Sequence, residues 1–228
     1  MDSKLGLYVI FEGNEGTGKS STMSAVAEHF RGNLNPKLTH HPGSTPLGAH
    51  LRKLVKFPHE IDKDIYIDPL TRQCLYMADT ISFVESVLKP SLNVGQTVFA
   101  DRSTFISGLV YGTADNVDPQ EIYKLLQLIK PPLADRLYIL QCPWYVTRQR
   151  INASRQNNQD HYDNQSDEFF QRVDKKYSEL LTGTPEQLMM VSRVTHLDNV
   201  IYINADRPQQ QVVDDIILDL ESYINNLD

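Results

Sequence analysis

The first strong pattern in the chain is a short apolar run followed by a glycine-rich turn. Leu7 to Phe11 form the apolar run, residues 13–18 form the turn, and apolar positions then recur at helical spacing. These positions are Met23, Val26, Ala27 and Phe30. A continuous apolar run is typical of a buried strand, whereas spacings of three and four are typical of an amphipathic helix. The segment therefore predicts a strand, a loop and a helix in that order.

More short runs with β-forming residues follow, and helical patterns lie between them. These runs are Lys37 to His40, Thr97 to Ala100, Leu137 to Leu140 and Val200 to Ile203. Strands that alternate with helices are joined by crossover connections, which make the strands parallel and cover both faces of the sheet. We therefore expect an α/β three-layer sandwich around a parallel sheet of about five strands. No internal repeat or long linker divides the chain, so we expect one domain over residues 1–228.

Two helices are predicted by more than their spacing. Asp118-Pro119-Gln120-Glu121 combines a capping aspartate with a proline at the first helical position and a glutamate three residues after the cap. Residues 212–227 carry a one-sided apolar stripe that is expected to pack on the sheet. In contrast, Asn152 to Ser166 has almost no apolar residues, and we expect it to be mobile and solvated.

Composition and charge restrict the class of protein. The chain has 228 residues, of which 40% are hydrophobic and 22% charged, and this balance is typical of a globular protein. Its net charge of -7, without a long basic run, argues against a nucleic-acid surface. Cys74 and Cys142 lack the spacing of a zinc site. Because no separate apolar leader and no stretch of 18 apolar residues occur, we expect a cytoplasmic protein with no membrane partner.

The glycine-rich turn matches the phosphate-binding pattern GxxxxGK[ST]. It follows an apolar strand and opens a helix, so its backbone N–H groups and the helix N-terminus face one anion-binding hollow. In this loop Lys19 is expected to neutralise β- and γ-phosphate oxygens, and Ser20 to ligate Mg²⁺. A plain surface turn is the alternative, and this context disfavours it. The residues expected to bind ATP are Gly13, Asn14, Glu15, Gly16, Thr17, Gly18, Lys19, Ser20 and Ser21.

An acid and a base follow the strand-like segment Thr97 to Ala100. Asp101 and Arg102 would lie at the carboxyl end of that strand, which is where ligands bind in an open parallel sheet. Asp101 is expected to hold a metal-bound water or to position the acceptor, and Arg102 to bridge two phosphates. A structural ion pair between the two side chains is the alternative.

Five blocks of residues, in order along the chain, resemble the thymidylate kinase family of P-loop nucleoside-monophosphate kinases. The blocks are Phe11 to Ser20, Pro42 to Arg52, Val84 to Pro90, Asp101 with Arg102, and Ser107 with Tyr111. The resemblance implies transfer of the γ-phosphoryl group of ATP to dTMP, with Mg²⁺ carried by ATP and bound near Ser20 and Asp101. It also implies a homodimer.

The same resemblance implies roles for single residues. Arg52 resembles the arginine that binds the acceptor monophosphate, a task suited to a bidentate guanidinium. Glu15 resembles a carboxylate facing the acceptor sugar, Tyr76 takes the place of a phenylalanine stacked on thymine, and Tyr111 lies near the sugar 2′ position. The acceptor set implied in this way is Glu15, Arg52, Tyr76, Thr80, Arg102, Ser107 and Tyr111.

The catalytic arginines are expected to come from a lid. Gly16 stands where some members carry a catalytic arginine, so the chain resembles the bacterial-type subclass, in which a flexible lid supplies these arginines. That lid would span about residues 148–166 and carry Arg148, Arg150 and Arg155. Mobile arginines that close over ATP would neutralise the migrating group and exclude water. An exposed basic helix is the alternative.

The chain departs from the family pattern at positions that recognise the acceptor base and at one position of the lid. Thr80 takes the place of an arginine that reads the thymine carbonyl, His40 and His41 replace an Arg-Glu pair, and Gly112 replaces a usual glutamine. His161 aligns with a usual lid arginine. A threonine is too short to replace a guanidinium, so base recognition must use other groups, with Asp79, Arg72 or water as candidates.

The sequence therefore leads to a Mg-ATP-dependent nucleoside-monophosphate kinase with dTMP or dUMP as acceptor. A deoxynucleoside kinase is one alternative, because such enzymes share the P-loop and a block like Asp101-Arg102-Ser103. A nucleotide-binding protein with weakened catalysis is another. Arg52 favours the monophosphate kinase, because an acceptor phosphate requires a cationic clamp and a nucleoside does not.

Overall fold

The core of the protein is a five-stranded parallel sheet. The computed structural model describes residues 6–154 and 160–227, and the strands lie in the order β2-β3-β1-β4-β5. The strands are β1 (Tyr8–Gly13), β2 (Lys37–His40), β3 (Val98–Asp101), β4 (Arg136–Gln141) and β5 (Val200–Asn204). Each adjacent pair is parallel. The expected α/β fold with about five parallel strands is therefore confirmed.

Helices cover both faces of this sheet. The α-helices are α1 (Lys19–His29), α2 (Pro46–Lys56), α3 (Pro69–Phe83), α4 (Lys89–Asn93), α5 (Thr104–Ala114), α6 (Pro119–Leu126), α7 (Trp144–Ser154), α8 (Asp167–Ser178), α9 (Pro185–Ser192) and α10 (Gln209–Asn225). Short 3-10 turns occupy Phe30–Gly32, Pro58–Glu60 and Leu197–Asn199, and a π-helical stretch at Val84–Leu88 joins α3 to α4. Within the described ranges, no helix is both long and apolar enough to cross a lipid bilayer.

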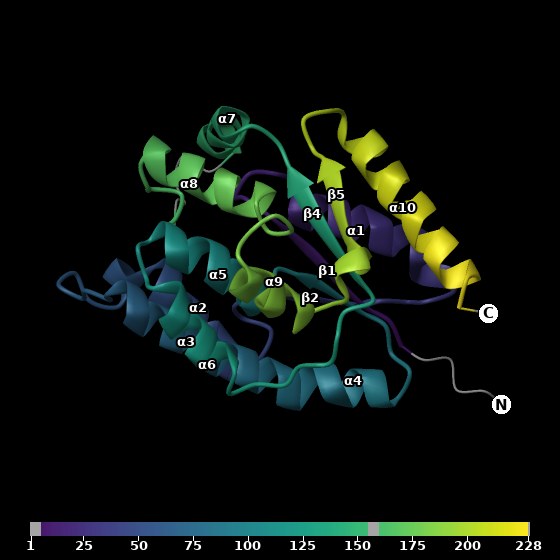
Figure 1. The fold of residues 1–228 in the computed structure, drawn as a ribbon, viewed down its shortest axis with the longest axis horizontal. Helices are drawn as coiled ribbons and strands as arrows, with labels where there is room; N and C mark the ends of the chain where they lie inside the picture. The colour runs from purple at the N-terminus through teal and green to yellow at the C-terminus, as the bar shows by residue number, and fades with distance from the viewer. Residues whose placement is uncertain (1–5, 155–159, 228) are drawn as a thin grey trace.

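The central strand β1 connects two hydrophobic cores. Val9 and Phe11 pack with α1 and α10, whereas Tyr8 and Ile10 pack with the helices of the opposite face. Successive side chains of a strand point to opposite faces, so this alternation builds the three layers. Figure 1 shows α1 and α10 on one side of the sheet, and α5 and α9 on the other.

The chain changes direction across the sheet at β1. Strand β3 lies on one side of β1 and β4 on the other, and ligands in open parallel sheets bind beside such a switch. Strand β1 ends at Gly13 and α1 begins at Lys19. The loop of residues 13–18 therefore lies at the place where this topology creates a binding site.

The two helices that the sequence predicted around residues 118–121 and 212–227 are present as α6 and α10. Helix α6 begins at Pro119, and the side chain of Asp118 accepts a hydrogen bond from the backbone N–H of Gln120 at 2.9 Å. It ends at Leu126, earlier than the apolar spacing indicates, although Ile129 is still buried in the core. Helix α10 directs its apolar stripe onto the sheet.

Three residues of the polar stretch Asn152 to Ser166 are packed in the protein and not solvated. Asp160, Tyr162 and Asp163 are buried. Asp160 Oδ1 accepts hydrogen bonds from the backbone N–H groups of Tyr162 at 2.8 Å and Asp163 at 3.1 Å, so this acidic side chain closes a turn. The expectation of a solvated segment is therefore wrong for these residues. Arg155 lies outside the described residues, and the mobility of the lid stays a prediction.

Candidate active site

Glycines allow the phosphate loop to pass close to its neighbours. Gly13, Gly16 and Gly18 have φ angles of 141°, 79° and 89°, a region that favours glycine. A Cβ atom at Gly13 would lie 2.2 Å from the carbonyl oxygen of Leu140, and one at Gly16 would lie 2.7 Å from that of Thr147. The loop therefore requires glycine at these two positions.

Lys19 points back over the loop. Its Nζ donates to the carbonyl oxygen of Asn14 at 2.7 Å, and Thr17 Oγ1 donates to the same oxygen at 3.0 Å. Burial and, next, the charge of Arg102 lower the pKa of Lys19 to about 8. A bound anion would stabilise the charged form of this side chain.

Ser20 and Asp101 meet at the mouth of the loop. The hydroxyl of Ser20, in the first turn of α1, donates to Asp101 Oδ2 at the end of β3. A hydroxyl and a carboxylate are hard oxygen ligands of the kind that Mg²⁺ prefers. These two side chains therefore fit a magnesium ion. Among the described residues, no group of three or more His, Cys, Asp or Glu side chains is arranged to hold a metal ion.

A cavity of about 560 Å³ opens above the phosphate loop. Residues that were predicted to bind ATP or to act in catalysis line this cavity. They are Glu15, Gly16, Gly18, Lys19, Ser20, Ser21, Asp101, Arg102 and Arg150. Arg52, which was expected to bind the acceptor phosphate, also lines this cavity. The lining side chains come from the loop and from α2, β3 and α7. We call this space the donor cavity. Asn14 and Thr17 are buried in the loop beneath it and hold its shape.

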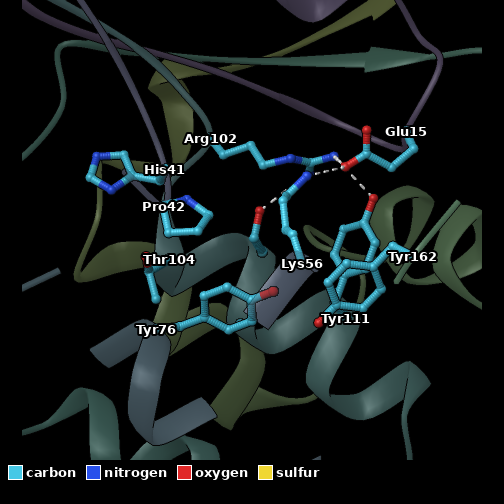
Figure 2. Close-up of a pocket in the computed structure, with 11 residues that line it drawn as sticks. Glu15, His41, Pro42, Lys56, Tyr76, Arg102, Thr104, Tyr111 and Tyr162 are labelled. Carbon is cyan, nitrogen blue, oxygen red and sulfur yellow. Dashed lines mark hydrogen bonds and ion pairs between the residues drawn. The ribbon is translucent and has the colours of Figure 1, made fainter. Parts of the chain in front are cut away.

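A second, smaller cavity shares lining residues with the first. It contains the predicted acceptor residues Glu15, Tyr76, Arg102, Ser107 and Tyr111. Figure 2 shows Tyr76 on α3 opposite the Glu15 and Arg102 pair, with Tyr111 at the same space. We call this space the acceptor cavity.

Arg102 is the most heavily bonded side chain of the site. Its Nη2 donates to Glu15 Oε1 at 2.8 Å and to the hydroxyl of Tyr111 at 3.1 Å. Its Nη1 donates to the carbonyl oxygen of Gly13 at 3.1 Å and to the hydroxyl of Tyr177 at 3.2 Å. The backbone of Arg102 has a φ of 78°, which is uncommon for a residue other than glycine. These contacts hold the guanidinium between the loop and the acceptor cavity.

Glu12 is a buried acid that the sequence reasoning did not assign to the site. Its Oε1 accepts from the backbone N–H of Ser103 at 2.7 Å and from Ser107 Oγ at 2.9 Å, and its Oε2 accepts from the hydroxyl of Tyr177 at 2.8 Å. A charged residue at the end of an otherwise apolar strand was the available signal. Glu12 fixes the residues that follow Arg102.

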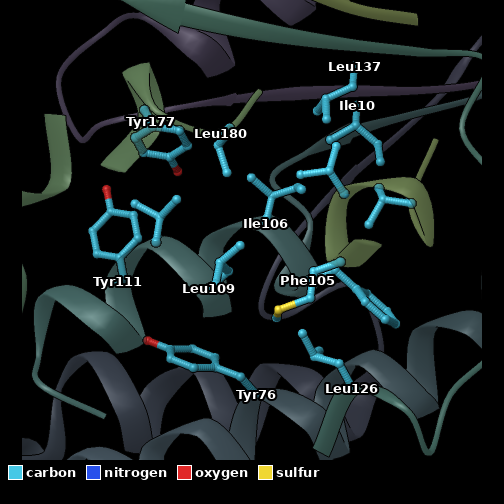
Figure 3. Close-up of a cluster of buried hydrophobic side chains, with 14 of the residues drawn as sticks. Ile10, Tyr76, Phe105, Ile106, Leu109, Tyr111, Leu126, Leu137, Tyr177 and Leu180 are labelled. Carbon is cyan, nitrogen blue, oxygen red and sulfur yellow. The ribbon is translucent and has the colours of Figure 1, made fainter. Parts of the chain in front are cut away.

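The tyrosines of the site are anchored in the larger core. Tyr76, Tyr111 and Tyr177 belong to the same hydrophobic cluster as Ile106 and Leu109. Figure 3 shows Tyr111 and Tyr177 at one edge of this cluster. Burial raises the pKa of Tyr76 to about 12, so its hydroxyl keeps its proton at neutral pH. Tyr76 and Tyr111, held in this way, form part of the wall of the acceptor cavity.

The structure does not bring Thr80 to the acceptor cavity. Its hydroxyl donates to the carbonyl oxygen of Tyr76 at 2.9 Å within α3, and the side chain faces a smaller space beside Phe83. The alternative base readers are also engaged elsewhere. Asp79 accepts from the backbone N–H of Gly43 at 3.0 Å, and Arg72 donates to the carbonyl oxygen of Val55 at 2.6 Å. None of these three residues is among the described residues that line the acceptor cavity.

The lid arginines differ in position. Arg150 lines the donor cavity, and its Nη2 donates to the carbonyl oxygen of Ala205 at 3.1 Å, in the loop after β5. Arg148 does not line either cavity, as far as the structure describes them. It donates to the carbonyl oxygen of Asp163 at 2.7 Å and lies over the ring of Phe170 at 4.7 Å. The structure therefore places Arg150, but not Arg148, beside the phosphate loop.

The histidines that depart from the family pattern also differ. His41 is buried, with Nδ1 3.2 Å from Asp79 Oδ2 and its ring against Phe83. His41 therefore lies in the turn after β2 with its side chain buried, and it does not replace an exposed charged residue. Burial lowers the pKa of His161 to about 4, with the charge of Arg72 as the next cause. His161 is neutral at pH 7, so it does not replace the charge of an arginine.

Lys56 and Tyr162 are two further lining residues that the sequence reasoning missed. Lys56 ends α2, four residues after Arg52, and this spacing puts both on one helix face. Tyr162 is an aromatic residue inside a polar stretch. Neither position belongs to a motif, and only the fold brings the two residues together.

The fold and the site define a class of protein. A P-loop on a parallel sheet, a donor cavity above it and an acceptor cavity beside it are the parts of a P-loop phosphotransferase. A family model described as Thymidylate kinase matches residues 11–216. The chain belongs to the thymidylate kinase family.

Individual relatives agree over nearly the whole chain. A protein named Thymidylate kinase from Legionella pneumophila (strain Corby) is 30% identical over 231 residues, covering 99% of this chain and 99% of the relative. One from Legionella pneumophila (strain Paris) is 32% identical, covering 88% and 92%. One from Shewanella frigidimarina (strain NCIMB 400) is 29% identical, covering 100% and 98%.

Proposed function

We propose that this chain transfers the γ-phosphoryl group of Mg-ATP to the 5′-phosphate of dTMP, giving dTDP and ADP. The observation that carries the proposal is that the two cavities share Glu15, His41, Lys56 and Arg102 among their lining residues. A triphosphate over the phosphate loop and a monophosphate in the acceptor cavity would therefore meet at these side chains. Family membership and the names of the relatives support the same reaction.

The donor half of the reaction rests on the loop. Lys19 and the loop N–H groups would bind β- and γ-phosphate oxygens, and Ser20 and Asp101 would hold Mg²⁺. The metal, when bound, neutralises charge on these oxygens. Arg150 would add positive charge from α7, because it already lines this cavity. Arg148 and Arg155 stay proposals for the closed lid.

The acceptor half rests on a rigid set of side chains. Arg102 would bridge donor and acceptor phosphates, and Arg52, held by the carbonyl oxygen of Pro42 at 2.8 Å, would bind the acceptor phosphate. Tyr76 would stack on the base, Tyr111 would pack beside the sugar, and Glu15 would accept from the 3′-hydroxyl. An oxygen of the acceptor phosphate would attack the γ-phosphorus, and the bond to the β-phosphate would break with its electron pair left on ADP.

The reaction is tested by ADP release with Mg-ATP against dTMP, dUMP, dGMP, dAMP, thymidine and deoxycytidine. We expect dTMP to support turnover, with dUMP as the next acceptor. If only the nucleosides support turnover, the monophosphate proposal is wrong. If ATP binds but none of the six compounds releases ADP, the chain is a nucleotide-binding protein without this activity.

We further propose that the protein acts in the cytoplasm as a homodimer, as the family resemblance implies. Light scattering coupled to size-exclusion chromatography would measure the assembly directly. A mass of 26.0 kDa at micromolar concentration would correspond to a monomer and would contradict the dimer.

A further inference from the structure

Lys56 lies at the junction of the two cavities. It is one of the four residues that line both, and its side chain is only 9% exposed. It reaches this place from the last position of α2, a helix that begins with Pro46 and is capped by Thr45. Figure 2 shows Lys56 beside the Glu15 and Arg102 pair. A phosphoryl group that moves from one cavity to the other must pass this ammonium.

The ammonium of Lys56 keeps hydrogen-bonding capacity that Arg102 has lost. Its Nζ donates to Asp160 Oδ2 at 2.5 Å, and it is 3.8 Å from Glu15 Oε1, beyond hydrogen-bonding distance. A lysine ammonium has three N–H donors, and Asp160 is the one hydrogen-bond partner that the described residues give it. Arg102 already donates to the loop, to Glu15 and to the tyrosine hydroxyls.

Lys56 is a cationic residue beside His161 of the lid segment, which is neutral at pH 7. The backbone N–H of His161 donates to the carbonyl oxygen of Lys56 at 2.9 Å, so the two positions are adjacent in space. The imidazole of His161 is neutral at pH 7, because burial lowers its pKa to about 4. At this end of the lid segment, the positive charge beside the reacting groups comes from α2.

We propose that Lys56 is a further catalytic residue, which donates a hydrogen bond to an oxygen of the phosphoryl group during transfer. The proposal rests on the proposed phosphotransfer reaction. Charge spreads over the phosphoryl oxygens in the transition state, and a preorganised cation stabilises that charge more than it stabilises bound substrate. Asp160 holds the ammonium in place before the substrates arrive, and no proton needs to move.

The test compares kcat and KM in variants of the full chain. Lys56→Met removes the charge but keeps an unbranched side chain, and we expect kcat to fall about 100-fold while KM for ATP and for dTMP changes less than threefold. Lys56→Arg keeps the charge and should recover part of the loss. Lys53→Met is the matched control, because Lys53 lies on the same helix, is 55% exposed and lines neither cavity over the described residues. It should match the wild type.

A purely structural role for Lys56 predicts a different pattern. Lys56→Met leaves Asp160 buried without its cation, so the variant loses stability in either case. Asp160→Asn keeps an oxygen for the amides of Tyr162 and Asp163 and keeps the charge of Lys56, and we expect it to lose less than tenfold in kcat. Lys56→Met/Asp160→Asn removes both charges, which restores thermal stability but should leave kcat low.

Two results would show that Lys56 is only the counter-ion of Asp160, and either would overturn the proposal. One is an equal loss of kcat in Lys56→Met and in Asp160→Asn. The other is recovery of kcat in the double variant. Wild-type kcat in Lys56→Met would also overturn it. In all three cases the wild-type protein would still phosphorylate dTMP. If the wild type itself releases no ADP with dTMP, the proposed function is wrong instead, so the two failures are distinguishable.

Discussion

Arg102 and Glu15 form a buried ion pair between the phosphate loop and the acceptor cavity, with Nη2 2.8 Å from Oε1. The pair joins residues that are 87 positions apart in the chain. It is also part of a larger network, because the same guanidinium donates to Gly13, Tyr111 and Tyr177. A planar guanidinium serves several acceptors in fixed directions, which an ammonium does not do.

Arg102→Lys is therefore expected to lower kcat/KM for dTMP by about 100-fold, because the positive charge remains but the network does not. Steady-state ADP release measures this loss. Arg136→Lys is the control, since Arg136 also pairs with a carboxylate, Asp219, at 2.9 Å but lies outside both cavities as described. We expect both variants to lose some stability and only the first to lose activity. Similar kcat/KM values in the two variants would contradict a catalytic role.

ATP binding is expected to weaken above pH 8. Burial lowers the pKa of Lys19 to about 8 in the free protein, so this side chain is charged below that pH and neutral above it. Bound phosphates favour the charged form, and binding at higher pH must therefore take up a proton. Affinity should fall by up to about tenfold per pH unit. Calorimetry at pH 8.5 to 9, in two buffers with different ionisation enthalpies, measures the uptake.

Lys19→Arg separates this effect from other titrations. Arginine stays charged over the whole range, so the variant should bind ATP without proton uptake, whatever its affinity at pH 7. Proton uptake of the same size in the variant would show that another group titrates. No uptake in the wild-type protein would show that Lys19 is already charged when ATP binds.

The fold and the donor side of the site could be predicted because their signals are local. The strand before Gly13, the helix after Lys19 and the glycines between them are contiguous, and physical rules connect that pattern to a phosphate site. Asp101 and Arg102 could be placed beside the loop because they end a neighbouring parallel strand.

The acceptor side could be predicted only in part, because it is assembled from distant helices. Position 80 resembles a base-reading position, yet the hydroxyl of Thr80 turns back to the carbonyl oxygen of Tyr76 in its own helix. A short side chain on a helix often satisfies itself in this way. Lys56 and Tyr162 carry no motif. Lys56 reaches the acceptor cavity from the end of α2, and Tyr162 reaches it from the turn closed by Asp160. Such non-local packing has no signature in one sequence.

The acceptor base is expected to depend on Tyr76 and not on Thr80. Tyr76→Ala removes a buried ring from the wall of the acceptor cavity and should raise KM for dTMP at least tenfold. Thr80→Ala, four residues along the same helix, should change that KM less than threefold, because the removed hydroxyl bonds only within α3 among the described residues. Competition between dTMP and dUMP, followed by product analysis, measures both effects. A changed preference in Thr80→Ala would place this side chain at the base.

Tyr177 tests how far the stability of the fold and the geometry of the site depend on the same hydrogen bonds. Its ring is 1% exposed, and its hydroxyl donates to Glu12 Oε2 at 2.8 Å while it accepts from Arg102 Nη1 at 3.2 Å. Tyr177→Phe keeps the ring but leaves the buried carboxylate with one donor fewer, which should cost about 1–3 kcal/mol of unfolding free energy. Urea denaturation measures that cost. Because Arg102 Nη1 loses one of its acceptors, kcat should fall as well.

Tyr123→Phe is the control, since that hydroxyl lies beside Met189 near the surface. It should change neither the unfolding free energy nor kcat. A stable but inactive Tyr177→Phe protein would mean that the hydroxyl positions Arg102 without stabilising Glu12, whereas an unstable but active one would mean the reverse.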